Sequence, residues 1–233
     1  MMLHLTIDDR RISVPRGYTL LQAARENGIP IPTLCFHEAL LPYGACRLCL
    51  VELAGPRGSR LVASCAYPCE DDLVAHTTGD LVVSTRRTVV ELLMATGAHL
   101  PVVRALAREL GIAEPPVALE SNDCILCGLC VRACRDIVGV GAISLTDRGM
   151  DRAVRTPFRI ASADCIECGT CALVCPTGAI HVADVTHPIR TMHSHASIYE
   201  RRACRLCEYD PPGAPFPASY QELFGVSGPQ SHD

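Results

Sequence analysis

The chain has 233 residues, a length that suits one large domain or two to three small ones. Aromatic residues make up only 4% of it and tryptophan is absent, so small aliphatic side chains must fill any core. The net charge of −4 and the pI of about 6.1 exclude a broadly basic surface for nucleic acid.

The N-terminal segment predicts two strands and a helix. Apolar and polar residues alternate over 2–7, which is the pattern of a half-buried strand, and Ile12 and Val14 continue the same period. The segment YTLLQAARENG (18–28) is typical of a helix, with Thr19 as its N-cap and an Asn-Gly pair as its stop signal.

Two further strands and then two helices follow. The segments 48–55 and 60–65 predict strands joined by a Gly/Pro turn, which completes a small α+β domain. The segments 84–97 and 101–111 are helical by period and composition, and each ends at a glycine. These helices predict a connector that closes at the Glu-Pro-Pro of 114–116.

The cysteine content is high, at fifteen residues. The N-terminus has no apolar stretch behind its charges, and Arg10-Arg11 is followed by ISVPRG, so we expect neither a secretory nor a twin-arginine signal. The sequence contains no run of 18 or more apolar residues that would predict a membrane span. We therefore expect a cytoplasmic protein, because in a reducing cytosol dense cysteines more often hold metal than form disulfides.

A cysteine-rich unit occurs twice. SNDCILCGLCVRAC (121–134) and SADCIECGTCALVCP (162–176) both follow C-x2-C-x2-C-x3-C, the run of bacterial ferredoxins. Three thiolates at two-residue intervals wrap a loop around one face of a cubane, and Gly128 and Gly169 relieve crowding there. We expect the fourth cysteine to start a helix that leads away, and so to reach the other cluster.

If each fourth cysteine binds the cluster of the other run, the sequence predicts two [4Fe–4S] sites. The first is formed by Cys124, Cys127, Cys130 and Cys175. The second is formed by Cys165, Cys168, Cys171 and Cys134. Zinc is the alternative, but zinc sites use two C-x2-C pairs separated by a longer spacer, which fits this pattern poorly. The first run also has four extra residues before Gly141, which lengthen the helix or loop after its last cysteine.

Four N-terminal cysteines have a different spacing, C-x10-C-x2-C-x15-C. They are Cys35, Cys46, Cys49 and Cys65. A long loop with the first ligand, a tight C-x2-C pair and a remote fourth ligand suit a [2Fe–2S] cluster, although the plant-type spacing begins with C-x4-C. Gly44 supplies the backbone freedom needed near the sulfides. Buried structural cysteines or zinc are the alternatives.

The sequence over about 1–185 resembles the iron–sulfur electron-transfer subunits of NAD-linked complexes. The resemblance rests on IPTLCFHEALLPYGACRLCLVEL (31–53), the later ASC and the two ferredoxin runs. The small diaphorase subunit of NAD-reducing hydrogenases and the N-terminal part of the large iron–sulfur subunit of respiratory complex I share these modules, as do iron-only hydrogenases and NAD-dependent formate dehydrogenases. The resemblance implies a β-grasp plant-type ferredoxin fold followed by a bacterial two-cluster ferredoxin fold.

One module of that family is missing. Between the two ferredoxin parts, the family usually carries a histidine followed by three cysteines that ligate another [4Fe–4S] cluster. Here the matching segment is MATGAHLPVVRALARELGI (94–112), in which His99 takes the place of the family histidine but no cysteine follows. We therefore expect this cluster to be absent and His99 to be a helix-end histidine.

The predicted organisation has four parts. They are a [2Fe–2S] β-grasp ferredoxin domain at 1–78, a helical connector at 79–116, a two-cluster [4Fe–4S] ferredoxin domain at 117–185 and an irregular C-terminal tail at 186–233. We expect the tail to be irregular because it is rich in His, Pro, Gly and Ser.

Three cysteines remain outside the predicted clusters, namely Cys69, Cys204 and Cys207. Together with His76 or His99 they are candidates for an additional metal site. The C-x2-C pair in the tail is also compatible with a zinc clip, a redox pair or an inert role. Cys69 alone is most simply a small buried apolar residue.

The sequence predicts a carrier of electrons rather than a catalyst. It has no G-x-G-x-x-G for a nicotinamide or flavin, and no Ser/His/Asp constellation, so we assign no catalytic residue. By resemblance, the chain relays single electrons between a flavin-bearing subunit that handles NAD(H) and a second catalytic subunit, a hydrogenase or a formate dehydrogenase. The alternative is a freestanding polyferredoxin, but such shuttles tend to be small and acidic. An iron–sulfur sensor would need a DNA-binding helix pair and a basic face, and the sequence shows neither.

Overall fold

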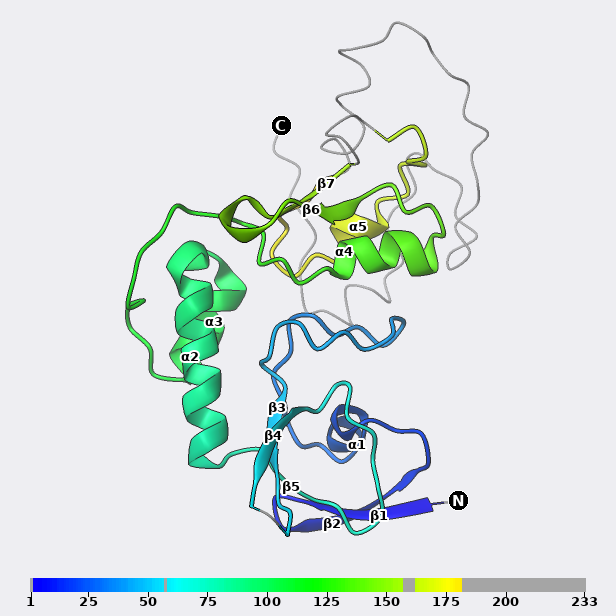
Figure 1. Ribbon diagram of the computed structural model, residues 1–233, viewed down its shortest axis with the longest axis vertical. Coiled ribbons are helices and arrows are strands. Elements are labelled where there is room, and N and C mark those ends of the chain that lie inside the picture. The colour runs from blue at the N-terminus through cyan, green and yellow to red at the C-terminus, as the bar shows by residue number, and fades with distance from the viewer. Residues whose placement is uncertain (1, 57, 157–161, 182–233) are drawn as a thin grey trace, which may run out of the picture.

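The N-terminal part of the chain forms a five-stranded mixed sheet (Figure 1). The computed structural model describes residues 2–56, 58–156 and 162–181. The strands are β1 (Met2–Ile7), β2 (Arg10–Pro15), β3 (Leu50–Leu53), β4 (Arg60–Ala63) and β5 (Val74–His76). Their order is β2-β1-β5-β3-β4, in which β1 and β5 run parallel and the other neighbours run antiparallel.

The first four strands confirm the strands predicted from the sequence, and β1 and β2 also confirm the predicted alternation. Every second residue of β1 and β2 is buried, so the apolar side chains of this hairpin form one face of the core. The strands β3 and β4 are shorter than the predicted segments 48–55 and 60–65. Sequence patterns did not reveal β5, because this strand is only three residues long and its partners β1 and β3 lie far away in the chain.

The predicted helix is α1 (Leu20–Glu26), and its apolar side packs against this sheet. Thr19 and Gln22 form a capping box at the start of the helix. The Thr19 hydroxyl accepts from the backbone N–H of Gln22, and the Gln22 side chain accepts from the N–H of Thr19 at 2.9 Å. Asn27 is the C-cap of the helix, and Gly28 follows with a φ of +68° that suits a glycine.

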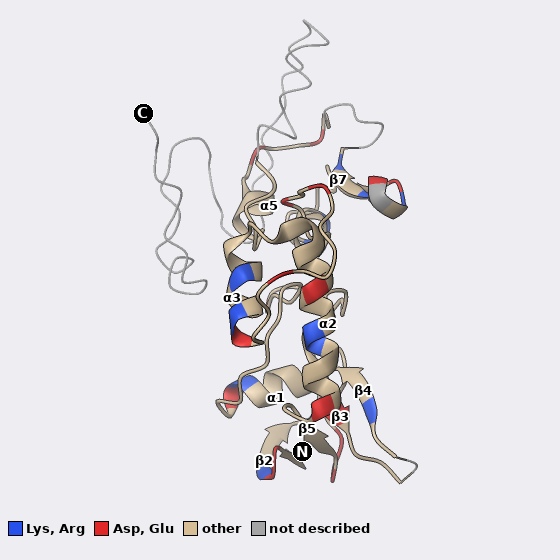
Figure 2. Ribbon diagram, turned by 90° about the vertical axis from the view of Figure 1, so that its left-hand side faces the viewer, with Lys and Arg blue, Asp and Glu red and all other residues tan. Residues whose placement is uncertain are grey.

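Two helices form the connector, α2 (Asp80–Gly97) and α3 (Pro101–Glu109). They confirm the predicted pair, although α2 begins four residues earlier than the segment 84–97. They extend along one side of the molecule, with basic and acidic positions interspersed on them (Figure 2). Their shared core contains residues from both helices and also Leu34 and Leu48 from the N-terminal part. Within the described residues, no helix combines the length and apolar character needed to cross a lipid bilayer.

Arg86 attaches the connector to the sheet domain. Its side chain is buried in α2 and donates three hydrogen bonds to backbone carbonyls, from Nε to Leu48 at 2.9 Å, from Nη1 to Thr77 at 3.0 Å and from Nη2 to Leu50 at 2.7 Å. Burial lowers the pKa of its guanidinium. Leu48 and Leu50 flank Cys49, so the arginine holds the chain at a predicted ligand.

The cysteine-rich part consists of short elements. They are α4 (Leu129–Arg132), the π-helical turn η1 (Ala133–Ile137), β6 (Ser144–Thr146), the 3-10 turn η2 (Gly149–Asp151), β7 (Ala153–Arg155) and α5 (Thr170–Leu173). After Cys134 the chain continues α4 as η1 up to Ile137, and residues 138–140 then lead out of the helix to Gly141, so the insertion lengthens both the helix and the loop. The predicted tail, 186–233, lies outside the described residues.

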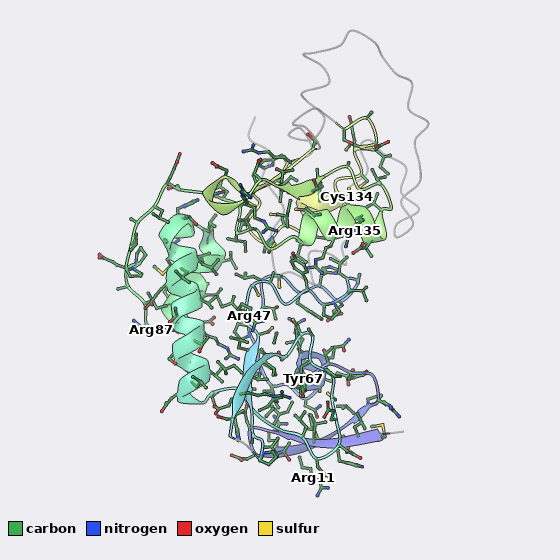
Figure 3. All side chains as sticks on the ribbon, in the orientation of Figure 1. Arg11, Arg47, Tyr67, Arg87, Cys134 and Arg135 are labelled. Atoms are coloured by element: carbon green, nitrogen blue, oxygen red, sulfur yellow. The ribbon has the colours of Figure 1, made fainter. Side chains whose placement is uncertain are left out.

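The buried position of Arg86 yields a stability prediction. We expect Arg86→Gln to lower the free energy of unfolding by about 3 kcal/mol, because three buried carbonyls lose a charged donor. The neighbouring Arg87→Gln is the matched control, since Arg87 lies on the outer side of α2 (Figure 3) and its side chain is 46% exposed. Thermal unfolding of the cluster-loaded protein measures both variants, and equal losses would contradict the assigned role of Arg86.

Candidate metal centres

The β3–β4 hairpin and the preceding loop bring the four N-terminal cysteines together. Cys35 and Cys46 lie at the two ends of one loop, while Cys49 precedes β3 and Cys65 follows β4. The antiparallel pairing of β3 with β4 places the last two side by side, and Ser64 donates both its N–H and its hydroxyl to the carbonyl of Cys49. Three of the four are only 1% exposed, and Cys46 is half-buried.

These thiols are arranged as two pairs. A hydrogen bond shared by the Cys35 and Cys46 thiols lowers the pKa of Cys46 to about 5 and raises that of Cys35. In the same way, the hydrogen bond between Cys49 and Cys65 lowers the pKa of Cys49 to about 7 and raises that of Cys65. Each pair therefore contains one sulfur that loses its proton readily, as a metal ligand must.

The loop that carries Cys46 directs backbone N–H groups toward sulfur. The N–H of Cys46 itself donates to the Cys35 sulfur at 3.3 Å, and the N–H groups of Leu34 and Leu48 further lower the pKa of Cys46. Positive φ angles at Gly44 (+68°) and Arg47 (+59°) give the loop this shape. Arg47 is labelled in Figure 3.

The two ferredoxin-type runs have the same backbone conformation. Leu126 and Glu167 occupy equivalent positions and have φ angles of +54° and +58°, and Gly128 and Gly169 have φ angles of +72° and +71°. Burial raises the pKa of the Cys124 and Cys165 thiols, and the N–H groups of Leu126 and Glu167 oppose that shift. Two runs with equivalent donors and equivalent left-handed residues thus confirm the duplication seen in the sequence.

The fourth cysteines are placed differently from our expectation. Neither Cys134 nor Cys175 starts a helix: Cys134 lies inside the continuous α4–η1 helix, and Cys175 follows the end of α5. The helices start instead at the two left-handed glycines, so the third cysteine lies on the first turn and the fourth lies farther along. This offset directs the fourth sulfur away from the cavity of its own run.

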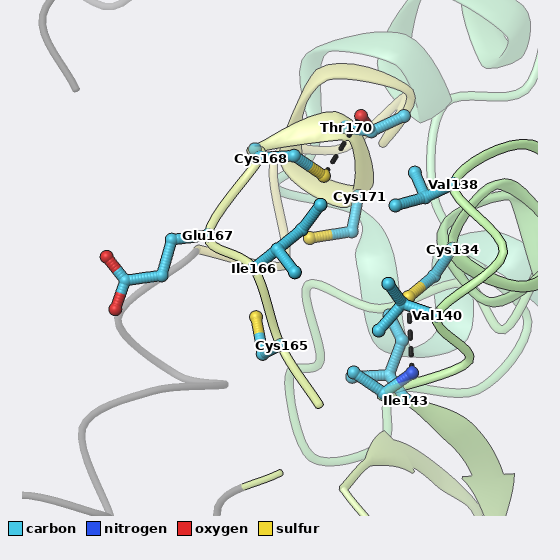
Figure 4. Close-up of a pocket in the computed structure, with 12 residues that line it drawn as sticks. Cys134, Val138, Val140, Ile143, Cys165, Ile166, Glu167, Cys168, Thr170 and Cys171 are labelled. Carbon is cyan, nitrogen blue, oxygen red and sulfur yellow. Dashed lines mark hydrogen bonds between the residues drawn. The ribbon is translucent and has the colours of Figure 1, made fainter. Parts of the chain in front are cut away.

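Two cavities collect the eight cysteines in a crossed arrangement. One cavity, of about 240 Å³, is lined by Cys124, Cys127, Cys130 and Cys175. The other, of about 20 Å³, is lined by Cys165, Cys168, Cys171 and Cys134. Figure 4 shows Cys134 reaching the second cavity from the side opposite the segment that carries Cys165, Cys168 and Cys171. Ile143 lines both cavities and separates them.

The surroundings of these sulfurs suit an iron–sulfur cluster in both cavities. The fit lies in the donors, because the second cavity, at about 20 Å³, has room for little more than one water molecule. Each cavity has four sulfurs and a largely apolar wall, with Ile166, Val138 and Val140 among the residues around the second. Burial raises the pKa of Cys130 and of Cys171 to about 12.

Polar donors complete the cysteine surroundings. The N–H of Ala142 donates to the Cys134 sulfur at 3.3 Å, and the Thr170 hydroxyl lies 3.3 Å from the Cys168 sulfur (Figure 4). Hydrogen bonds to sulfur stabilise the negative charge that a thiolate-bound cluster carries.

Cys69 and His99 do not join these groups. Cys69 is buried in the hydrophobic core of the sheet domain, where burial raises its pKa to about 11. His99 lies just beyond the end of α2, and its Nε2 is 2.6 Å from Oδ1 of Asp123. Cys204 and Cys207 lie outside the described residues.

Arg132 is a residue of these surroundings that sequence patterns did not reveal. This arginine lies between Cys130 and Cys134, is 7% exposed, and hydrogen-bonds backbone carbonyls of the loop between Cys35 and Cys46. In the sequence, the only indication of this role was a single arginine among the small and apolar residues of VRAC (131–134). Sequence spacing could not show which loop the arginine reaches.

Two family models match the chain. The 2Fe-2S iron-sulfur cluster binding domain matches residues 1–80, and the 4Fe-4S dicluster domain matches residues 123–179. Together with the mixed sheet and the helices, they confirm an α+β protein with a 2Fe-2S and a 4Fe-4S domain.

Similar proteins are components of NAD-linked enzymes. The chain is 34% identical to a subunit of the NADH-quinone oxidoreductase of Rhizobium meliloti, over 77% of this chain and 24% of the relative. It is 36% identical to the HndD subunit of the NADP-reducing hydrogenase of Solidesulfovibrio fructosivorans, over 77% of this chain and 36% of the relative. It therefore spans only about a quarter to a third of these two curated relatives.

A solved structure covers a comparable length. A chain in the crystal structure of NAD+-reducing [NiFe]-hydrogenase in the H2-reduced state is 30% identical, with a TM-score of 0.59. The match covers 66% of this chain and 75% of that chain. With both cluster-domain models and these relatives in agreement, this chain belongs to the family of iron–sulfur subunits of NAD-linked complexes.

Proposed function

We propose that the chain relays single electrons between a flavin-bearing subunit that handles NAD(H) and a second catalytic subunit, a hydrogenase or a formate dehydrogenase. The relatives support this proposal, because their names include subunits of an NADH-quinone oxidoreductase and of an NADP-reducing hydrogenase. In this proposal the part at 1–78 is a β-grasp plant-type ferredoxin domain, 79–116 is a connector, and 117–185 is a two-cluster ferredoxin domain.

The proposal assigns three clusters to twelve cysteines. The [2Fe–2S] cluster is held by Cys35, Cys46, Cys49 and Cys65. One [4Fe–4S] cluster is held by Cys124, Cys127, Cys130 and Cys175, and the other by Cys134, Cys165, Cys168 and Cys171. The two cavities support the crossed assignment, since each is lined by three cysteines of one run and the last cysteine of the other.

One observation carries the proposal: a single apolar cluster contacts cysteines of all three sets. Its buried members include Cys35 of the N-terminal set and Cys127 and Cys130 of the first cubane set. Cys134 and Cys171 of the second cubane set pack against it. The three sites therefore lie in one continuously packed region, as an electron path through protein requires.

The residues around the sites keep them dry and polarise the sulfurs. When bound, iron–sulfur clusters supply reversible one-electron transfer at potentials set by cluster type, hydrogen bonds and exposure. The buried apolar residues Leu129, Ala142 and Ile143 exclude water from the cysteine-rich unit. Backbone N–H groups aimed at sulfur lower the cost of placing negative charge there.

Metal analysis tests the proposed cofactors. We expect about 10 iron and about 10 acid-labile sulfide atoms per chain in the anaerobically purified protein, from one [2Fe–2S] and two [4Fe–4S] clusters. The EPR spectrum of the reduced protein should contain one [2Fe–2S] signal and signals from two [4Fe–4S] centres. A colourless protein that contains zinc would refute the proposal. Co-purification with a flavoprotein distinguishes the docked subunit from a freestanding shuttle.

Cysteine substitutions test the crossed arrangement. We expect Cys175→Ser to perturb the same EPR signal as Cys124→Ser, and Cys134→Ser to perturb the same signal as Cys165→Ser, because each pair lines one cavity. Cys69→Ala is the control, and it should retain about 10 iron atoms. If Cys175→Ser instead matched Cys165→Ser, each run would hold its own cluster and the crossed assignment would be wrong.

A further inference from the structure

Arg132 is a buried cation at the point where the N-terminal and cysteine-rich parts meet. It is the last residue of α4, between Cys130, which lines one cavity, and Cys134, which lines the other. Its side chain is 7% exposed. A charge that is buried to this degree needs partners, because desolvation of an ion is costly.

The partners of Arg132 all come from one distant loop. Its Nη2 donates to the carbonyl of Cys35 and its Nη1 to the carbonyl of Leu41, each at 2.7 Å. Its guanidinium carbon lies 5.1 Å from the centre of the Tyr43 ring, in a cation–π contact. These residues lie about ninety positions away in the sequence, so one side chain joins the Cys35–Cys46 loop to α4.

These hydrogen-bond and ring contacts bring no negative charge to the guanidinium. The carbonyls and the ring are neutral, and within the described residues the Nε–H of Arg132 has no hydrogen-bond partner. The carboxylate of Asp136 is ion-paired with Arg135 at 2.6 Å, and the charge of Arg132 adds to the lowering of its pKa. The charge of Arg132 also opposes the rise in the pKa of the predicted ligand Cys127, and its Nη2 donates to the backbone carbonyl of the predicted ligand Cys35.

We propose that Arg132 is a positioning residue that holds the Cys35–Cys46 loop against the Cys124–Cys130 loop, and that its charge favours an added electron at the [2Fe–2S] site. The inference rests on the proposed function and deepens it. The step is a one-electron transfer: one site is oxidised, the next is reduced, and no bond forms or breaks and no proton moves. A fixed positive charge stabilises the site that holds the extra electron, so its removal should make the potential more negative.

The geometry also shows why arginine and not lysine stands here. The planar guanidinium donates to two carbonyls in fixed directions and stacks on an aromatic ring, whereas an ammonium has no such fork. Lysine would keep the charge but lose the paired hydrogen bonds to the two carbonyls. Glutamine would lose both. The two substitutions therefore separate the electrostatic effect from the positioning effect.

The experiment uses the full-length, cluster-loaded protein with Arg132→Lys, Arg132→Gln and the control Arg135→Gln. Arg135 lies three residues farther along the same helix, but its side chain is 65% exposed and paired with Asp136. The potential of the [2Fe–2S] centre is measured by EPR-monitored redox titration, and the mobility of residues 36–45 by amide hydrogen exchange.

We expect Arg132→Gln to shift the [2Fe–2S] potential to more negative values and to speed exchange in 36–45 about tenfold or more. Arg132→Lys should speed exchange in the same segment while it keeps the potential close to that of the wild type. Arg135→Gln should change neither, because water screens its charge. If Arg132 had only a structural role, both variants would exchange amide hydrogens faster, but their [2Fe–2S] potentials would not differ from each other.

Two results would overturn the inference. The first is an Arg132→Gln protein with all its iron, an unchanged potential and unchanged exchange. The second is an equal shift of the potential in Arg135→Gln. If Arg132→Gln does not accumulate with clusters, Arg132→Lys decides: faster exchange at a preserved potential supports the role, and unchanged exchange refutes it. A wild type without a [2Fe–2S] signal would instead refute the proposed function, and with it this inference.

Discussion

The convergence of sulfur atoms from distant parts of the chain is the constraint on which the cysteine-rich unit depends. Each run contributes three cysteines to one cavity and its last cysteine to the other. Neither run can complete a four-sulfur cavity alone, so the two halves must fold together. Ile143, which is buried and lines both cavities, separates two sites that are otherwise built from shared elements.

Left-handed backbone at equivalent positions makes this convergence possible. Gly128 and Gly169 end the ligand loops and begin the short helices, and Leu126 and Glu167 turn their N–H groups toward the first sulfur of each run. The insertion in the first half does not disturb this geometry, because its residues extend the ligand helix as η1 up to Ile137 and then form the short segment 138–140.

Buried arginines attach the loop of the N-terminal set to its neighbours. Arg86 of α2 donates to the carbonyls that flank Cys49, and Arg132 of α4 donates to the carbonyl of Cys35. Both guanidiniums are buried and hydrogen-bond backbone rather than carboxylates. Because every residue has a backbone carbonyl, these hydrogen bonds fix the path of the loop whatever its side chains are. The positive charges of the two arginines remain available to the sulfur ligands nearby.

The sequence by itself determined the elements that depend on local patterns. The alternation in 2–7 indicated a half-buried strand, Thr19 marked the start of α1, and the repeated cysteine spacing indicated which eight thiols belong together. Only the tertiary structure decided the features that depend on partners remote in the chain. The strand β5 exists because β1 and β3 lie on either side of it, and Arg132 is buried because a loop about ninety residues away packs over it. The physical reason is that spacing and propensity report on neighbours along the chain, whereas strand pairing and charge burial depend on neighbours in space.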